Sequence, residues 1–318
     1  MKIVASAGHP EVAMVYVVEF PNGLVECVEA VQPPRTREEK WVLMISTLFG
    51  CPIACQMCDA GGHYKGKLTE PEMFAQIEYL IEQRYPNGFV PSEQFKIQFA
   101  RMGEPALNMA VIDLLEKLPD RINAPGLMPS VSTIAPHGTD EFFDRLIEVK
   151  NNVYPTGRFQ FQFSIHTTDS DLRDQIIPVK KWDFERMSKF GENYHKPGDR
   201  KITLNFALAE NSPVEPNVLL RHFDPDKFLI KVTPLNPTYQ AESTGLTSYV
   251  DPNNKVAIYP ELEKIREAGY QVIISIGEQE ENRIGSNCGQ YVQKHILESG
   301  GLSEGYTYQV TESVKNSD

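Results

Sequence analysis

The stretch Cys51-Pro-Ile-Ala-Cys55-Gln-Met-Cys58 brings three thiols together in the spacing C-x3-C-x2-C. Three thiolates can hold three irons of a [4Fe-4S] cubane and leave the fourth iron open to another ligand. The alternative is a zinc site, but zinc usually takes a fourth Cys or His at a regular spacing, and His63 is the only nearby candidate. The spacing therefore predicts an iron–sulfur cluster held by Cys51, Cys55 and Cys58.

Composition limits what surrounds this cluster. The chain has 318 residues, of which 41% are hydrophobic, enough for one large α/β domain. Its formal net charge of -12 gives no general attraction toward a phosphate backbone, so nucleic acid is not an expected partner. No apolar run approaches the ~18 residues that cross a bilayer, and the odd number of cysteines suits a reducing compartment. We expect a cytoplasmic protein without a membrane partner.

The pattern along the chain alternates strands and helices. Val12–Phe20 and Leu24–Ala30 are β-rich and are separated by Pro21-Asn22-Gly23, which predicts a hairpin. Thr69 and Glu72 form a T-x-x-E capping box that starts a helix directly after the cysteine loop. Six later strands, each followed by a helical pattern, predict a parallel sheet: Trp41–Thr47, Phe95–Arg101, Ser130–Ile134, Phe159–His166, Ile202–Leu208 and Phe228–Pro234.

Two further segments carry a family resemblance. Arg101-Met-Gly-Glu-Pro-Ala-Leu-Asn108 is similar to a G-E-P-x-x-N segment, and Asn287-Cys288-Gly-Gln290 is similar to a C-G-Q segment. With the cysteine motif, and in the same order from about Glu26 to Gln290, they make the chain resemble the RlmN/Cfr type of radical S-adenosylmethionine (SAM) methyltransferases, which methylate an adenine of ribosomal or transfer RNA.

The resemblance implies an α/β fold, a partial (β/α)6 radical SAM barrel with an N-terminal β-hairpin extension. We assign residues 1–40 to that extension, 41–280 to the barrel, and 281–318 to a C-terminal loop with Cys288 and a polar tail. Cluster, SAM and substrate are then expected at the C-terminal ends of the strands. The implied cofactors are the [4Fe-4S] cluster and SAM, and an electron donor such as flavodoxin or ferredoxin would be a partner.

The same resemblance assigns the SAM contacts. The Gly103–Glu104 region would meet the amino group of SAM, which is chemically sensible because a carboxylate accepts hydrogen bonds from an ammonium. Further contacts are implied at three other strand ends, each of which taken singly is more often a satisfied cap or turn residue: Ser132, Ser164 with His166 in an S-x-H segment, and Asn236 in a P-x-N-P segment.

Two residues receive catalytic roles from the resemblance. Cys288 would be methylated by one SAM and would then lose hydrogen to a radical formed from a second SAM. A lone cysteine is otherwise a small buried apolar residue. Glu26 aligns with the family's general base, and its alternative is an exposed strand glutamate.

The match breaks at Met44, where the RNA methylases carry a cysteine that resolves a covalent adduct. Cys27 is an unsuitable substitute, because strand neighbours face opposite ways and Glu26 is adjacent. The hairpin begins near residue 12, which leaves no room for the accessory RNA-binding domain usual in the family. We therefore expect a small-molecule or peptide substrate.

Several functions stay open. The first hypothesis is methyl transfer through Cys288 to a non-ribosomal substrate. The second is a non-methylating radical SAM enzyme that catalyses hydrogen abstraction, rearrangement or cyclisation, with Cys288 as hydrogen-atom donor or covalent anchor. Lesser alternatives are an RNA adenine methyltransferase whose adduct is resolved by an external thiol, and a non-enzymatic iron–sulfur protein.

Overall fold

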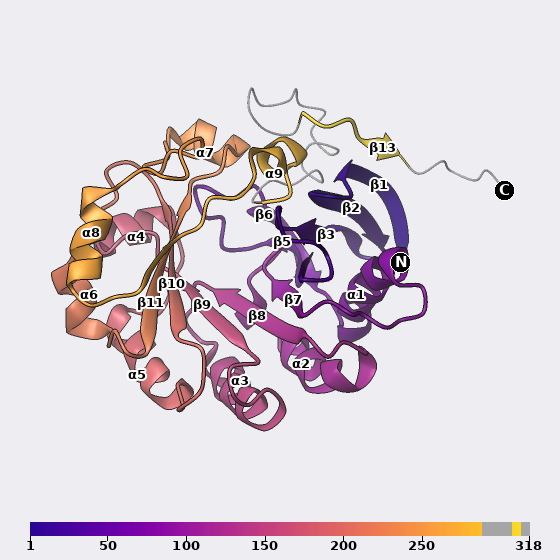
Figure 1. The fold of residues 1–318 in the computed structure, drawn as a ribbon, viewed down its shortest axis with the longest axis horizontal. Coiled ribbons are helices and arrows are strands. Elements are labelled where there is room, and N and C mark those ends of the chain that lie inside the picture. Colours follow the sequence, from indigo (N-terminus) through magenta and orange to yellow (C-terminus); the bar gives the residue numbers. More distant parts are fainter. Residues whose placement is uncertain (288–306, 313–318) are drawn as a thin grey trace.

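One curved sheet organises the computed structural model, which describes residues 1–287 and 307–312. The sheet has 11 strands in the order β12-β11-β10-β9-β8-β7-β4-β3-β2-β1-β13. From β4 to β12 all neighbours are parallel, and these strands curl into an open barrel (Figure 1). They are β4 Lys40–Ile45, β7 Gln94–Phe99, β8 Leu127–Thr133, β9 Gln160–Ser164, β10 Ile202–Leu208, β11 Phe228–Pro234 and β12 Val272–Ile274.

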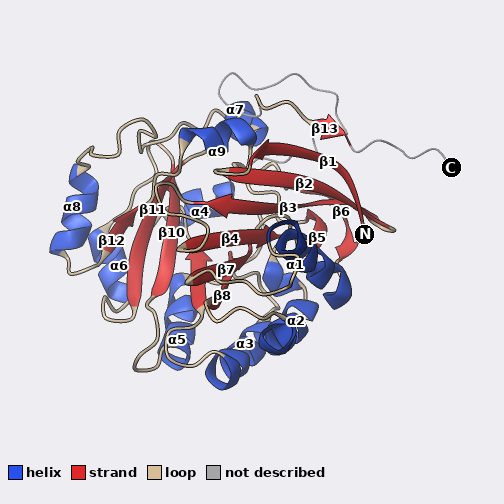
Figure 2. Ribbon diagram, turned by 45° about the vertical axis from the view of Figure 1, so that its right-hand side comes forward, coloured by secondary structure: helices blue, strands red, loops and turns tan. Residues whose placement is uncertain are grey.

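Most of the helices connect consecutive parallel strands and lie outside the barrel (Figure 2). The capping box predicted for the first of them is confirmed, because Thr69 and Glu72 each accept the backbone N–H of the other. No helix among the described residues is long and apolar enough to span a bilayer. The helices are α1 Glu70–Arg84, α2 Ala110–Arg121, α3 Asp140–Val153, α4 Ser170–Ile176, α5 Phe184–Tyr194, α6 Pro216–His222, α7 Tyr239–Thr244, α8 Pro260–Glu267 and α9 Gln279–Ile284, with the 3-10 turn η1 at Pro105–Leu107.

The N-terminal strands continue the barrel sheet. The predicted hairpin is confirmed as β2 Ala13–Phe20 and β3 Gly23–Val31, and β3 pairs antiparallel with β4. Two strands of this sheet were not predicted: β1 Lys2–His9 pairs with β2, and β13 Thr311–Glu312 pairs with β1. The predicted fold class, a partial (β/α)6 barrel with an N-terminal hairpin extension, is confirmed.

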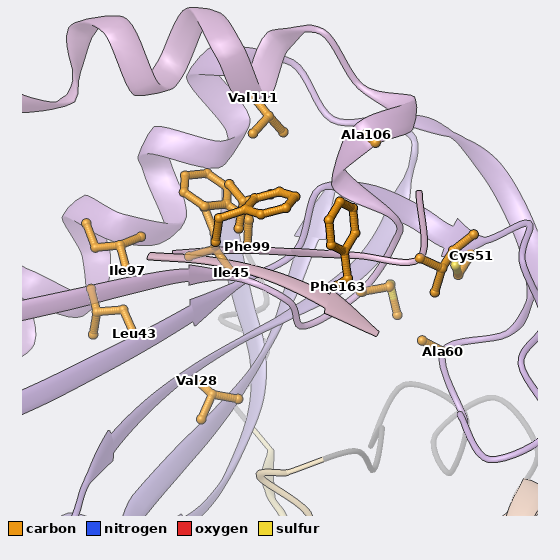
Figure 3. Packing of buried hydrophobic residues seen from close by; sticks show 14 of the residues in the cluster. Val28, Leu43, Ile45, Cys51, Ala60, Ile97, Phe99, Ala106, Val111 and Phe163 are labelled. Carbon is orange, nitrogen blue, oxygen red and sulfur yellow. The ribbon is translucent and has the colours of Figure 1, made fainter. Parts of the chain in front are cut away.

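A side chain's place along a barrel strand decides whether it packs outward or lines the lumen, because successive residues of a strand point to opposite faces. On β7, Phe95, Ile97 and Phe99 are fully buried in the apolar layer under the helices. Figure 3 shows part of this layer. The alternate positions on the same strand are Gln94, Lys96 and Gln98, and they face the lumen. The hydrophobic core therefore lies outside the barrel wall, and the inside is polar.

A buried charged network ties the N-terminal extension to the first helix of the barrel. Glu29 of β3 is 1% exposed. It accepts two hydrogen bonds from the Nε and Nη2 of Arg84, with a shortest distance of 2.5 Å, and others from the Trp41 indole and the Tyr16 hydroxyl. A buried carboxylate is tolerated only when it is satisfied in this way.

We predict that Glu29→Ala lowers the free energy of unfolding by about 3–5 kcal/mol, because it leaves the Arg84 guanidinium without its partner in a largely buried site. Urea denaturation followed by circular dichroism measures the change. Glu19→Ala is the matched control, since Glu19 belongs to the same extension but pairs with Lys2 in solvent. Equal stability of the two variants would contradict the prediction.

Candidate cluster and cofactor site

The cysteine loop is a compact turn between two short strands. Cys51 ends β5 Leu48–Cys51, and β6 Gly62–Lys67 begins shortly after the third cysteine. Ala54 has a left-handed backbone with φ of 54°. A Cβ on Gly61 would lie 2.8 Å from the Ala54 Cα. Glycine is therefore required at position 61 for the loop to close on itself.

Burial and backbone N–H groups act on the thiols of Cys51 and Cys55 in this loop. Burial raises the pKa of Cys51 to about 11, but backbone N–H groups of Ile53, Ala54 and Glu104 face its sulfur and favour the thiolate. Burial, and then the nearby Cys51, raise the pKa of Cys55 to about 12. Thiols in such a setting lose their protons on binding metal. The donor set and its backbone N–H groups thus fit a thiolate-bound cluster.

The described residues do not gather three His, Cys, Asp or Glu side chains around one metal-ion position. A cubane makes a different demand from a single ion, because it takes each cysteine on a separate iron.

The loop is hydrogen-bonded to the segment that follows β11, on the other side of the barrel mouth. Asp59, which follows the third cysteine, is fully buried and accepts the backbone N–H groups of Tyr239 and Gln240 at 3.1 and 2.9 Å, at the start of α7. Thr238 donates its hydroxyl to the Met57 carbonyl at 2.9 Å. The cysteine loop and the segment after β11 therefore form one wall. Sequence reasoning missed Asp59, whose only signal was its position directly after Cys58.

Gly103 allows the G-E-P turn to pack against the strand that carries Cys51. Its φ is +100°, and a Cβ there would lie 2.5 Å from the Cβ of Leu48. The turn is held further by the backbone of Met102, whose carbonyl accepts the N–H of Thr47 at 2.8 Å. The expected SAM-binding turn is thus hydrogen-bonded to the start of the strand that ends at the first cluster cysteine.

Glu104 is held at the meeting point of β7 and β8. Its carboxylate accepts the Thr133 hydroxyl at 2.5 Å and the N–H groups of Ala106 and Ile134 at 3.0 and 2.9 Å. Burial raises its pKa to about 6. A carboxylate has about four lone-pair positions. These three bonds put two donors on Oε1 and one on Oε2, so capacity remains on Oε2 for an ammonium.

The other predicted SAM contacts lie at the same edge of the sheet. Ser132 and Ser164 are half-buried at the C-terminal ends of β8 and β9, and Asn236 follows β11 by two residues. His166 is buried, and its Nδ1 accepts the Ala207 N–H at 3.1 Å. Burial lowers the His166 pKa to about 4, so its imidazole is neutral near pH 7.

Glu26 is buried, so the alternative of an exposed strand glutamate is wrong. Its Oε2 lies 2.5 Å from the Nη2 of Arg101. The same guanidinium donates to the carbonyls of Gly285, Ser286 and Asn287 at 3.0, 2.9 and 3.3 Å. Sequence reasoning missed Arg101 as a site residue, although an arginine directly after a buried strand and before Gly-Glu-Pro was a usable signal.

The sequence also singled out three further sulfur-bearing residues, which are Cys288, Cys27 and Met44. Cys288 lies outside the described residues, which stop at Asn287 on this side of the gap. Cys27 is fully buried, and burial raises the pKa of its thiol. Cys27 shares a face of β3 with Glu29, which binds Arg84 of α1, whereas Glu26 on the other face pairs with Arg101. The predicted alternation of Glu26 and Cys27 is therefore confirmed. Met44 pairs with Val28 and is half-buried.

Comparison with known proteins finds relatives that are similar to part of this chain. No family model matches the chain. A relative from Desulfitobacterium hafniense (strain Y51), named "Probable dual-specificity RNA methyltransferase RlmN", is 29% identical over 190 residues, covering 58% of this chain and 50% of the relative. The dual-specificity RNA methyltransferase RlmN of Halorhodospira halophila is 28% identical over 219 residues, covering 65% and 56%. The chain thus spans about half the length of the curated relatives it matches.

Among solved structures, a radical SAM methyltransferase from Sphaerobacter thermophilus superimposes with a TM-score of 0.67 and 19% identity, over 91% of this chain and 80% of that one. At this identity the likeness establishes the fold. The chain has the partial-barrel fold of a radical SAM methyltransferase and, over part of its length, is similar in sequence to the RlmN methyltransferases.

Proposed function

We propose that this chain is a radical SAM enzyme that transfers one carbon to a small-molecule or peptide substrate, with Cys288 as methyl carrier. Cys51, Cys55 and Cys58 would hold the [4Fe-4S] cluster. When bound there, the cluster supplies the electron that splits SAM into methionine and a 5′-deoxyadenosyl radical. An electron donor such as flavodoxin or ferredoxin, and a cytoplasmic location, belong to the same proposal.

The contact between the G-E-P turn and the cysteine loop is the observation that carries this proposal. The backbone N–H of Glu104 faces the Cys51 sulfur, while the Glu104 carboxylate keeps acceptor capacity on Oε2. A ligand that has both an iron-chelating end and an ammonium could bind the cluster beside Cys51 and donate to the Glu104 carboxylate at the same time. The amino-acid end of SAM has this chemistry. An iron–sulfur electron carrier has no need of a carboxylate with remaining acceptor capacity beside its cluster.

Arg101 supports the role of Cys288. It holds the carbonyls of Gly285, Ser286 and Asn287, and Asn287 directly precedes the cysteine. Arg101 is also three residues before Glu104 on the same strand end. Asn287, the residue before Cys288, is thus held beside the proposed SAM site. In this proposal Arg101 is a positioning residue, and Glu26 holds Arg101 rather than taking a proton.

The substrate is proposed to be other than ribosomal RNA. The formal charge of -12 offers no general attraction to a polyanion.

Met44 favours a second candidate function, because a thioether at the position of the family's resolving cysteine cannot form the disulfide that releases product. In that candidate the chain catalyses a non-methylating radical reaction, and Cys288 donates a hydrogen atom or anchors the substrate.

Labelling separates the two candidates. We predict that anaerobic incubation of the reconstituted protein with SAM bearing a labelled methyl group transfers the label to Cys288, as measured by mass spectrometry of its peptide. Cys288→Ala should lose the label while still binding SAM. Deoxyadenosine formation with no label on the protein would support the non-methylating candidate and overturn methyl transfer.

We also predict that Cys55→Ala abolishes the cluster's visible absorbance and SAM cleavage, because one of the three iron ligands is lost. Cys27→Ala is the matched control. Its thiol is buried on the helix side of the sheet, so the variant should retain both properties. Iron and sulfide analysis of the two purified variants measures the difference. Full cluster content in Cys55→Ala would exclude the assigned ligand set.

Glu104→Gln tests the ammonium contact. The amide keeps the size of the side chain but removes the charge, so we expect SAM affinity to fall about 10- to 100-fold, the value of a hydrogen bond to a charged group. Equilibrium binding of SAM to the reconstituted variant measures this loss. Glu93→Gln is the control, because Glu93 precedes the same strand at its opposite end. Unchanged affinity in Glu104→Gln would remove the carboxylate from the SAM site.

A further inference from the structure

The lumen of the barrel has the opposite charge to the rest of the molecule. Lumen-facing positions of β7 and β11 include Lys96 and Lys231, and most others are glutamine, serine or threonine. The strand positions that face the lumen, from β4 through β11, include no aspartate or glutamate. In a chain with a formal charge of -12, this polarity is not a by-product of composition.

Lys96 is the deepest of these cations. It is only 9% exposed, and within the described chain it has no hydrogen bond or ion pair. The charged groups that act on it are all cations: Lys231, Lys40 and Arg200. Burial and these neighbours lower its pKa well below the usual value for lysine. A buried cation without an anion is costly, and an anion from outside the chain would remove that cost.

The interaction between Lys96 and Lys231 crosses the lumen. Their strands, β7 and β11, are separated in the sheet by β8, β9 and β10. Two side chains on such distant strands act on each other only if both point into the concave face of the barrel. The positive charges therefore face a common interior space.

A second polar group faces the same space without a partner. Asn205 of β10 stands in register with Lys231 on one side and Ser164 on the other. It is 9% exposed, and its Oδ1 has no hydrogen-bond partner among the residues that the structure describes. Buried amide oxygens are normally satisfied, so an orphan of this kind points to a missing ligand. Ser164 belongs to the proposed SAM contacts, and the row therefore leads from them toward Lys231.

We infer that the barrel lumen binds an anionic group of the substrate, a carboxylate or phosphate held by Lys96 and Lys231, with Asn205 accepting a neighbouring N–H or O–H of the same molecule. Lys96 and Lys231 each lie three residues before the end of their strands. At about 3.3 Å per residue, both lysines lie roughly 10 Å from the mouth of the barrel, measured along their own strands. The substrate would thus carry its anion and its reacting atom at opposite ends.

The identification of the bound molecule as a substrate rests on the proposed function, whereas the binding of an anion in the lumen does not. The test uses the anaerobically reconstituted protein and two probes, inorganic phosphate and succinate, titrated calorimetrically at ionic strength matched with potassium chloride. Lys96→Met and Lys231→Met remove the lumen cations. Lys189→Met is the control, because Lys189 is exposed on α5 and paired with Glu185 in solvent.

We expect saturable binding of at least one probe, which Lys96→Met and Lys231→Met weaken by about 10-fold or more while Lys189→Met leaves it unchanged. Binding of phosphate alone assigns a phosphate to the substrate, and binding of succinate alone assigns a carboxylate. Without anion, Lys96→Met should raise Tm by roughly 1–3 °C, because an unpaired buried cation is removed.

The inference fails if neither probe binds, or if Lys96→Met binds the probes as well as the unaltered protein does. It also fails if Lys96→Met melts below the unaltered protein in anion-free buffer, since Lys96 would then serve the fold. SAM cleavage is measured on the same samples. Loss of cleavage with intact anion binding would count against the proposed function alone, whereas normal cleavage without anion binding would count against this inference alone.

Discussion

The ion pair between Glu26 and Arg101 joins three parts of the chain that are far apart in sequence. Both side chains are withdrawn from water, which costs several kcal/mol per ion unless each is fully partnered. Here the Arg101 guanidinium is partnered by the carboxylate and by the carbonyls of residues 285–287. The N-terminal extension therefore supplies an anion that the barrel needs. Without Glu26, the arginine would be a buried charge, and the C-terminal segment would lose its attachment beside the G-E-P turn.

Two other carboxylates organise the mouth of the barrel by accepting backbone N–H groups. Asp59 caps the start of α7 and so links the cysteine loop to the segment after β11. Glu104 binds the N–H groups that follow β7 and β8. Loop backbone groups at strand ends have no partner within the sheet, so carboxylates that satisfy them also set where the loops lie. The loops around the candidate cofactor site are thus hydrogen-bonded to each other.

Much of the fold followed from local patterns. Alternating strands and helices, the Pro21-Asn22-Gly23 turn and the Thr69 capping box each depend on residues close in sequence, and β10 and β11 were predicted to the residue. The strands β1 and β13 were not predicted, because their pairing depends on contacts between the two ends of the chain. Local periodicity carries no information about such contacts.

For the candidate site, the residues predicted to contact SAM lie at the C-terminal strand ends as expected, but motif order did not reveal their hydrogen-bond partners. The burial of Glu26, its pairing with Arg101 and the bracing by Asp59 arise from tertiary contacts. The lumen cluster was missed for a related reason. Lys96 sits in the pattern of an ordinary half-buried strand, and only the closure of the sheet turns its polar face inward.

The separation of an apolar outer layer from a polar lumen bears on how this protein changes over evolution. Folding stability resides in residues such as Phe95, Ile97 and Phe99, which pack against helices and take no part in ligand contacts. The lumen side chains are mostly polar, so exchanges among them leave the apolar layer under the helices unchanged. Substrate preference can therefore diverge by exchanges among lumen positions while the scaffold stays above its stability threshold. Substitutions on the inner face of the barrel can therefore change which substrate binds without altering the packing of the outer layer.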